Sequence, residues 1–303
     1  MRSLSLSVIA TVAALLPAVP LAGQESVATG RHASHDAAIR IFSLTGSLRI
    51  TTWTRDSVSV RGRVDQSAGQ LALSGGDAAV KIAVEPPAER APNGTADLDI
   101  QVPAGARLWV KSSGAEVDIT AGGGQIEVQN GSGRVRVAGE AESVNVETLD
   151  GNVELVVHSP TARVRTASGT IVARNVVREL DASSVSGPLL VGMEGPIARA
   201  RLETVSSEIA FKGTLEPEGS LDAETHGGDV ELRLPATLGA AFHLVSYGGG
   251  LVNEMVPASV VRKGPGKGEW TFQTGDGRAT VEVRTFKGTV TLKVRGEPPV
   301  SKE

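Results

Sequence analysis

The chain has 303 residues, of which 40% are hydrophobic but only 3% aromatic, and its formal net charge is −4. Positive and negative residues are interspersed, which speaks against electrostatic binding of nucleic acid. The lack of cysteine excludes disulfides, thiolate metal sites and a cysteine nucleophile. Few aromatic residues together with 36 glycines indicate an all-β chain with a thin aliphatic core and many turns.

Residues 1–23 have the pattern of an export signal. Arg2 precedes an apolar run over 4–16, and the small residues Ala22 and Gly23 close the segment. The run is shorter than the roughly 20 apolar residues of a membrane span, and no later stretch is long enough either. We therefore expect cleavage between Ala22 and Gln24 and an extracytoplasmic protein, whether periplasmic, cell-surface or secreted.

Residues 24–37 are expected to form a flexible mature N-terminus, and they contain the best candidate for a metal site. His32 and His35, with Asp36, are residue types that bind zinc or copper. A disordered polar terminus explains the same residues more simply. We therefore predict no metal and no cofactor.

Residues 38–103 are expected to form a β cap on the N-terminal end of the molecule. Polar, glycine-containing segments separate its strand-like stretches, and a proline-rich loop covers 85–94. An antiparallel or mixed cap would protect the exposed end strand of a repeat structure. The predicted strands are 48–52, 57–64, 79–84 and 96–102.

A motif recurs along the chain from residue 39, and most of its copies lie in residues 104–295, which we expect to form the repeat domain. It reads apolar-x-apolar-x-Ser/Thr/Asn-x-x-Gly-x-apolar-x-apolar, as in 144–155 and 162–173. A fixed period of this kind indicates stacked units, none of which buries its apolar face alone. The starts at 126, 144, 162 and 180 are 18 residues apart, and later spacings are 20 and 21. The motif starts are Ile39, Ile126, Val144, Ala162, Leu180, Ala200, Leu221, Phe242, Trp270 and Val281.

Each half of the motif alternates apolar and polar residues, which predicts a strand with one face buried. The Ser/Thr-x-x-Gly between the halves predicts a turn. We therefore predict a parallel β-solenoid, or β-helix, with about 18–21 residues per coil. Two inward ladders follow, one through Ile126, Val144, Ala162, Leu180, Ala200, Leu221 and Phe242, the other through Val135, Val153, Ile171, Leu189, Ile209, Val230 and Leu251.

The same stacking predicts an outward row of charges that alternate in sign, Arg163, Asp181, Arg201 and Asp222. An ordinary solvated face explains these charges equally well. Two other solenoids fit the motif less well. A left-handed β-helix needs an apolar residue every six positions, and a calcium-binding roll needs Gly-Gly-x-Gly-x-Asp turns.

Residues 254–268 are expected to interrupt the repeat, with a basic flexible loop at 262–268, and residues 296–303 are expected to form a polar tail. Gly264–Gly268 lacks the Gly-Lys-Ser/Thr ending and the following helix of a phosphate-binding loop. The Asn-Gly pairs at Asn93 and Asn130 match a glycosylation pattern, but Asn-Gly also favours turns, which is the simpler interpretation.

No arrangement of catalytic residues emerges. His158, His226 and His243 have no serine or aspartate at a spacing typical of a triad, so we expect surface or turn residues. Carboxylate pairs such as Glu147 with Asp150, or Glu203 with Glu208, are common on charged solenoid faces. We predict no catalytic, cofactor-binding or metal-binding residue and no enzymatic activity.

The strands that end at Pro103 and Pro235, followed by repeated Ser/Thr-x-x-Gly-x-apolar units behind a signal peptide, resemble the bacterial putative-adhesin family. This family is a β-strand-repeat group of unknown function from cell envelopes. The resemblance covers about residues 37–294 and implies an extracytoplasmic β-solenoid with an adhesion or envelope function. It supplies no functional residues.

Three functional hypotheses follow. The leading one is a non-enzymatic adhesin or cell-envelope scaffold that contacts an envelope protein or a glycan. The alternative is a carbohydrate-active β-helix enzyme, a polysaccharide lyase or hydrolase, although sugar subsites use more aromatic residues than this chain offers. A structural or sensory domain that controls a partner is the third. The ligand, the handedness and the oligomeric state stay open.

Overall fold

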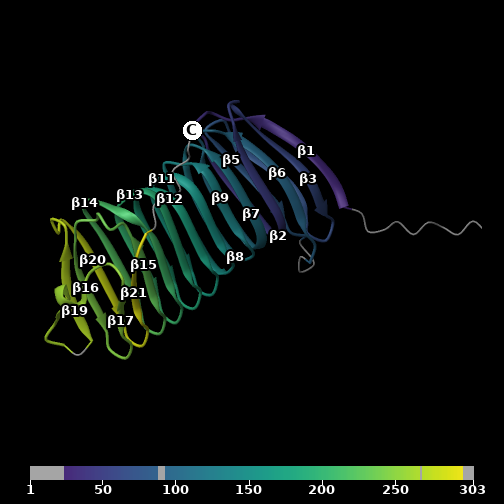
Figure 1. Cartoon of the computed structure of the whole chain (residues 1–303). Helices are drawn as coiled ribbons and strands as arrows, with labels where there is room; N and C mark the ends of the chain where they lie inside the picture. The colour runs from purple at the N-terminus through teal and green to yellow at the C-terminus, as the bar shows by residue number, and fades with distance from the viewer. Residues whose placement is uncertain (1–23, 88–92, 267, 296–303) are drawn as a thin grey trace, which may run out of the picture.

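The computed structural model describes residues 24–87, 93–266 and 268–295, so the predicted export signal and the polar tail lie outside it. Figure 1 shows an elongated body in which strands lie side by side, from β1 and β3 at one end to β16 and β19 at the other. In the part of the chain described, no helix is long and apolar enough to cross a membrane. The elements are β1 Gln24–His32, β2 Ala38–Trp53, β3 Ser57–Asp65, β4 Gln70–Gly76, β5 Ala79–Glu85, β6 Ala96–Pro103, β7 Arg107–Gly122, β8 Gln125–Ser132, β9 Val135–Glu140, β10 Ser143–Asp150, β11 Val153–Thr166, β12 Ile171–Ser184, β13 Leu189–Thr204, β14 Ile209–Thr225, β15 Val230–Leu234, β16 Ala240–Ser246, β17 Leu251–Asn253, the 3-10 turn η1 Ala258–Val260, β18 Arg262–Lys263, β19 Glu269–Thr274, β20 Ala279–Thr285 and β21 Val290–Val294.

The predicted parallel stacking is confirmed in the centre of the molecule. Val135, Val153 and Ile171 are direct partners in neighbouring parallel strands, and all three are buried. Long strands such as β11 run from the second half of one coil into the first half of the next, with a register shift around Ser159. The alternating pattern therefore builds one continuous aliphatic core.

The predicted Ser/Thr-x-x-Gly corners also form. At one corner, Oγ1 of Thr285 accepts a hydrogen bond from the Gly288 amide at 2.9 Å and donates to the Gly228 carbonyl of the neighbouring coil at 3.0 Å. A single hydroxyl therefore closes its own turn and holds the next coil in register. The buried corner residues are Ser43, Ser112, Asn130, Thr148, Thr166, Ser184, Thr204, Thr225, Thr285 and Ser246.

The C-terminal coils do not stack in sequence order. Strand β20 lies between β14 and β16, so Val281 is the partner of both Leu221 and Phe242. The predicted steps from Leu221 to Phe242 and from Val230 to Leu251 are therefore wrong. Strand β19, which contains the motif start at Trp270, pairs antiparallel with β16 and covers its other edge instead of starting a coil. The motif has the same form in both coils and so does not encode their order.

The N-terminal end shows a similar insertion. Strand β2 pairs in parallel with both β6 and β7, so it is a coil of the stack, whereas β1, β3 and β4 form the antiparallel pairs expected of a cap. Residues 24–32, expected to be flexible, form strand β1, which pairs antiparallel with β3. The sequence does not reveal β1 because its side chains are mostly exposed and only its backbone is needed at the edge of β3.

A row of alternating charges accompanies the insertion of β2. The in-register residues on β3, β6, β2, β7, β9 and β11 are Arg61, Asp99, Arg49, Asp118, Arg136 and Glu154.

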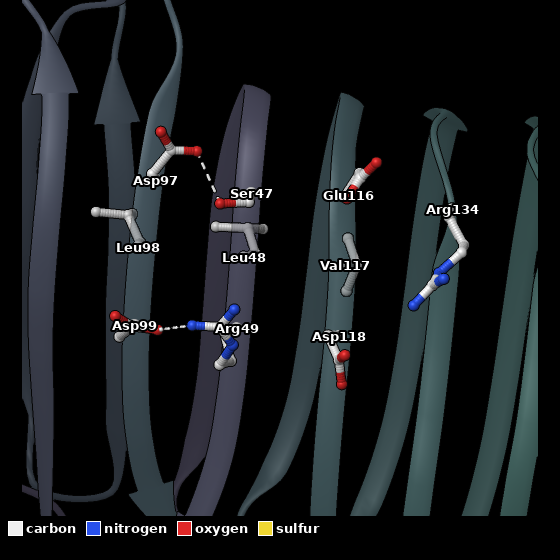
Figure 2. Close-up of a pocket in the computed structure, with 10 residues that line it drawn as sticks. All are labelled: Ser47, Leu48, Arg49, Asp97, Leu98, Asp99, Glu116, Val117, Asp118 and Arg134. Carbon is white, nitrogen blue, oxygen red and sulfur yellow. Dashed lines mark hydrogen bonds and ion pairs between the residues drawn. The ribbon is translucent and has the colours of Figure 1, made fainter.

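Figure 2 shows the ion pair between Arg49 and Asp99. The two groups lie 3.0 Å apart and line a hollow of about 290 Å³. Further along the row, Arg136 lies 3.5 Å from Asp118 and 3.6 Å from Glu154. Without β2 in between, Asp99 and Asp118 would be neighbours in the same register and would repel each other. These side chains satisfy one another, and we interpret this hollow as structural.

The predicted row Arg163, Asp181, Arg201 and Asp222 is in register, which confirms its alternation in sign. The inserted strand β20 then places Glu282 beside Asp222. Burial raises the pKa of Asp222; Arg284, 3.9 Å away, opposes this rise, and Glu282 adds to it.

Replacing Asp222 by asparagine is therefore expected to stabilise the protein slightly near neutral pH, by less than about 1 kcal/mol because the site is half exposed. A carboxyl whose pKa is raised by folding binds its proton more readily in the native state. Its unfavourable contribution is present above the folded-state pKa and disappears as the pH falls towards the unfolded value of 3.8. Urea unfolding at pH 7 and near pH 3 measures the difference, and a variant less stable than wild type at pH 7 would contradict it.

An apolar corner ridge as the candidate interaction site

One corner of the solenoid carries exposed apolar side chains in successive coils. They occupy the position that directly follows the buried corner Ser or Thr, and we call this row the corner ridge. In order along the stack its members are Leu149, Ala167, Val185, Val205, His226, Phe286 and Tyr247. Five of them are among the large exposed hydrophobic residues: Leu149 at 69%, Val185 at 54%, Val205 at 51%, Phe286 at 48% and Tyr247 at 63%.

The turn itself forces the ridge outward. Since the corner hydroxyl points into the core, the next side chain points to solvent. Backbone hydrogen bonds between coils then fix the ridge: the Val205 amide donates to the Val185 carbonyl at 3.2 Å, and the Ser186 amide donates to the Ala167 carbonyl at 3.0 Å. The ridge is therefore built on an ordered backbone, and its exposed apolar surface needs no rearrangement to be presented.

The insertion of β20 creates an aromatic cluster at one end of the ridge. The rings of His226 and Phe286 stack with centroids 4.9 Å apart and planes 5° from parallel. On the other side of Phe286, the Tyr247 ring lies 5.9 Å away and is tilted by 46°. Three rings that are distant in sequence thus form one surface.

A hollow of about 740 Å³ runs beside the ridge. Its apolar side is formed by ridge members from Val185 to Tyr247, and its other side by charged residues of the neighbouring sheet face. These charges are partly paired, since Arg201 donates to Glu203 and Arg284 lies 3.7 Å from Glu224. The arrangement combines an apolar surface with a rim of both charge signs.

The histidines near the N-terminus are not gathered into a metal site. His32 Nδ1 lies 3.3 Å from Asp77 Oδ2, whereas His35 packs against the backbone of Gly105. Across residues 24–87, 93–266 and 268–295, no group of three histidine, aspartate or glutamate side chains is placed to hold a metal ion.

The glycine-rich loop before β19 binds a carboxylate of its own chain. Glu269 accepts hydrogen bonds from the Gly266 amide at 3.0 Å and pairs with His243 Nε2 at 3.1 Å. The bond from Gly266 is the larger cause of the lowered pKa of Glu269, and His243 adds to it. Residue 267 lies outside the described part of the loop.

The remaining candidates have structural surroundings. Buried Asn130 uses its amide to donate to the Ala115 carbonyl at 3.0 Å, so it is a corner residue rather than a glycan acceptor. Asp150 accepts a hydrogen bond from Ser168, and Glu203 pairs with Arg201. His158 is an exposed residue at the end of a half-strand.

The corner ridge is not among the features predicted from the sequence, where His226 is expected to be a single surface or turn residue. A comparison of the motif copies at the position after the corner hydroxyl shows Leu, Ala, Val, Val, His, Tyr and Phe, which is the signal that would have found the ridge. The contact of Phe286 with both His226 and Tyr247 depends on the insertion of β20, which the motif does not encode.

The stacked coils and the hydroxyl-glycine corners define a parallel β-solenoid. The chain belongs to the Toastrack DUF4097 family, whose model matches residues 34–293. This match confirms the resemblance seen in the repeat. No curated protein matches the chain.

Two solved structures are similar to the chain. A putative cell adhesion protein from Clostridium sporogenes ATCC 15579 is 9% identical over 89% of this chain and 100% of that chain, with a TM-score of 0.22. A putative adhesin from Bacteroides fragilis NCTC 9343 is 10% identical over 89% of this chain and 98% of that chain, with a TM-score of 0.44.

Proposed function

We propose that the chain is a non-enzymatic adhesion or cell-envelope interaction module that acts outside the cytoplasm and docks a protein partner on the corner ridge. The observation that carries this proposal is the line of exposed apolar side chains from Leu149 to Tyr247. Nothing in the packing of the core requires these residues to be apolar. A contiguous apolar surface with a polar rim is typical of interaction sites.

The shape of the ridge favours a protein over a sugar. The His226 and Phe286 rings stack on each other and so cover part of the ring faces that a sugar would use. Leu149, Val185 and Val205 are aliphatic and extend the ridge over further coils. The rim carries arginine and glutamate, which suits the mixed charges around a protein interface.

The test compares two sets of substitutions in the mature protein. Leu149→Ser, Val205→Ser and Phe286→Ser together remove the apolar character of the ridge, whereas Val252→Ser and Val260→Ser change exposed valines elsewhere, at 47% and 44% exposure. We expect the ridge variant to lose at least about tenfold in affinity for envelope fractions prepared from source cells that lack the protein. Both variants should keep the wild-type melting temperature.

Equal binding by the ridge variant and wild type would contradict the ridge as the docking site. If wild type binds no envelope component and deletion of the gene leaves adhesion and envelope-stress responses intact, the function itself is wrong. A screen of polysaccharides for cleavage tests the non-enzymatic assignment, which turnover by wild type would overturn.

A further inference from the structure

A second surface is formed by the strand segments that follow the Ser/Thr-x-x-Gly corner of each coil. It carries two parallel rows of outward side chains. The first, which we call the basic row, holds Arg174, Lys212, Arg233 and Lys293, with Gly192 between the first two. The second, which we call the apolar row, lies two residues earlier on the same strands and holds Val172, Leu190 and Ala210.

The basic row differs from the rows of alternating charge described above. The residues from Arg61 to Glu154 and those from Arg163 to Asp222 alternate in sign, whereas Lys212, Arg233 and Lys293 are three like charges in consecutive register positions. Like charges placed directly opposite each other destabilise a sheet. The whole chain is acidic, with a net charge of −4, so a general excess of basic residues does not explain the row.

Only part of this positive charge is compensated. Glu231 contacts Arg233 at 2.6 Å and Lys293 at 2.8 Å, and so holds these two side chains in place. Arg174 and Lys212 form no ion pair within residues 24–87, 93–266 and 268–295, and both are exposed. The row therefore presents two fixed cations and two uncompensated ones.

Gly192 leaves room between the two uncompensated cations. A Cβ added at Gly192 would meet nothing closer than the Arg174 side chain at 4.0 Å. A shallow hollow of about 330 Å³ opens there, lined by members of both rows. A ligand can approach the sheet backbone at this point, with a cation on each side and the apolar row alongside.

We propose that this surface binds a linear anionic polysaccharide laid across the strands, with its acidic groups on the basic row and the apolar faces of its sugar rings on the apolar row. Neighbouring parallel strands are about 4.8 Å apart, so a chain running perpendicular to them meets the cations one after another. Charge-assisted contacts of arginine and lysine with carboxylate or sulfate groups supply the attraction.

A linear chain fits this surface better than an anionic membrane does. The cations form a single row and the row beside them is apolar, so the positive charge follows a line rather than spreading over an area. This surface is distinct from the corner ridge, so that this proposal and the proposed function can fail separately.

The experiment measures binding of the mature protein to immobilised alginate, with dextran sulfate as a second polyanion and neutral dextran as the blank. Arg174→Gln with Lys212→Gln should lower the affinity by roughly thirtyfold, since each cation near an anionic surface is worth about fivefold. The matched control, Lys111→Gln with Arg165→Gln, removes the same charge from exposed positions on the half of the coil that precedes the Ser/Thr corner. This control protein should bind alginate within about twofold of wild type.

Gly192→Val gives an independent test, because it fills the hollow without changing any charge. We expect it to weaken alginate binding at least tenfold at an unchanged melting temperature, while the ridge variant keeps wild-type alginate binding. Wild-type binding by the Arg174/Lys212 variant, or an equal loss in the control, would overturn the proposal. So would tighter binding to phosphatidylglycerol vesicles than to alginate with the same sensitivity to these variants, because the ligand would then be a membrane.

Discussion

Replacing Gly169 by alanine is expected to destabilise the protein by about 3 kcal/mol or more. An added Cβ would lie inside van der Waals contact of the Gly151 carbonyl in the neighbouring coil, and a backbone atom cannot move away without disturbing the stack. Gly151, Gly187, Gly228 and Gly288 are in the same situation, each against the backbone of the preceding coil in the stack. Denaturant unfolding of the variant measures the effect.

Two other glycines serve as matched controls. A Cβ added at Gly195 or Gly250 meets nothing within 4 Å, and neither residue needs a positive φ. Alanine at these positions should leave stability unchanged or raise it by up to about 1 kcal/mol, because the unfolded chain loses freedom. A Gly169→Ala protein as stable as these controls would show that the coils are not in close contact at this corner.

Replacing Val153 by aspartate is expected to prevent stable folding, with a loss of about 4 kcal/mol or more. Val153 is buried between Val135 and Ile171 in the core, where a carboxylate has no partner. Circular dichroism and thermal unfolding measure the loss.

Val156→Asp is the control for this substitution. Val156 belongs to the same strand, but its side chain lies on the outward face and is only partly buried. We expect it to change stability by less than about 1 kcal/mol. Equal effects of aspartate at positions 153 and 156 would contradict the assignment of the inward face.

The central coils could be predicted from the sequence because local and global signals agree there. Between β8 and β14, every step of the two predicted ladders follows the repeat, as with Val144 beside Ala162. The alternation of apolar and polar residues predicted which side chains face inward, and the Ser/Thr-x-x-Gly pattern predicted the positions of the corners. One face had to be buried, so the register was strongly specified.

The ends could not be predicted because strand order there is set by tertiary contacts. The coil that starts at Val281 has the same motif as the coil that starts at Phe242, so sequence order was the only guide, and it was misleading. Strand β1 has no buried face to leave a pattern. At the other insertion, the charges of Asp99, Arg49 and Asp118 contain information about strand order, but only once their strands are known to be neighbours.

The candidate site depends on the same insertion. The position of the ridge follows from the corner motif, but the contact of Phe286 with both His226 and Tyr247 requires that β20 separate β14 from β16. The order of these strands is therefore the central structural claim, because the fold and the proposed docking surface both rest on it.

Cysteine cross-linking tests this strand order most directly, since the chain has no cysteine of its own. Residues 222 and 282 are in-register neighbours, and 282 lies between 222 and 243. Neighbouring strands are about 4.8 Å apart, within the Cα distance of about 4.4–6.8 Å that a disulfide spans, whereas two steps of about 10 Å exceed it. We expect mild oxidation to join Asp222→Cys to Glu282→Cys and to leave the Asp222→Cys/His243→Cys pair reduced, as measured by mass spectrometry. A disulfide in the second protein and none in the first would contradict the inserted coil.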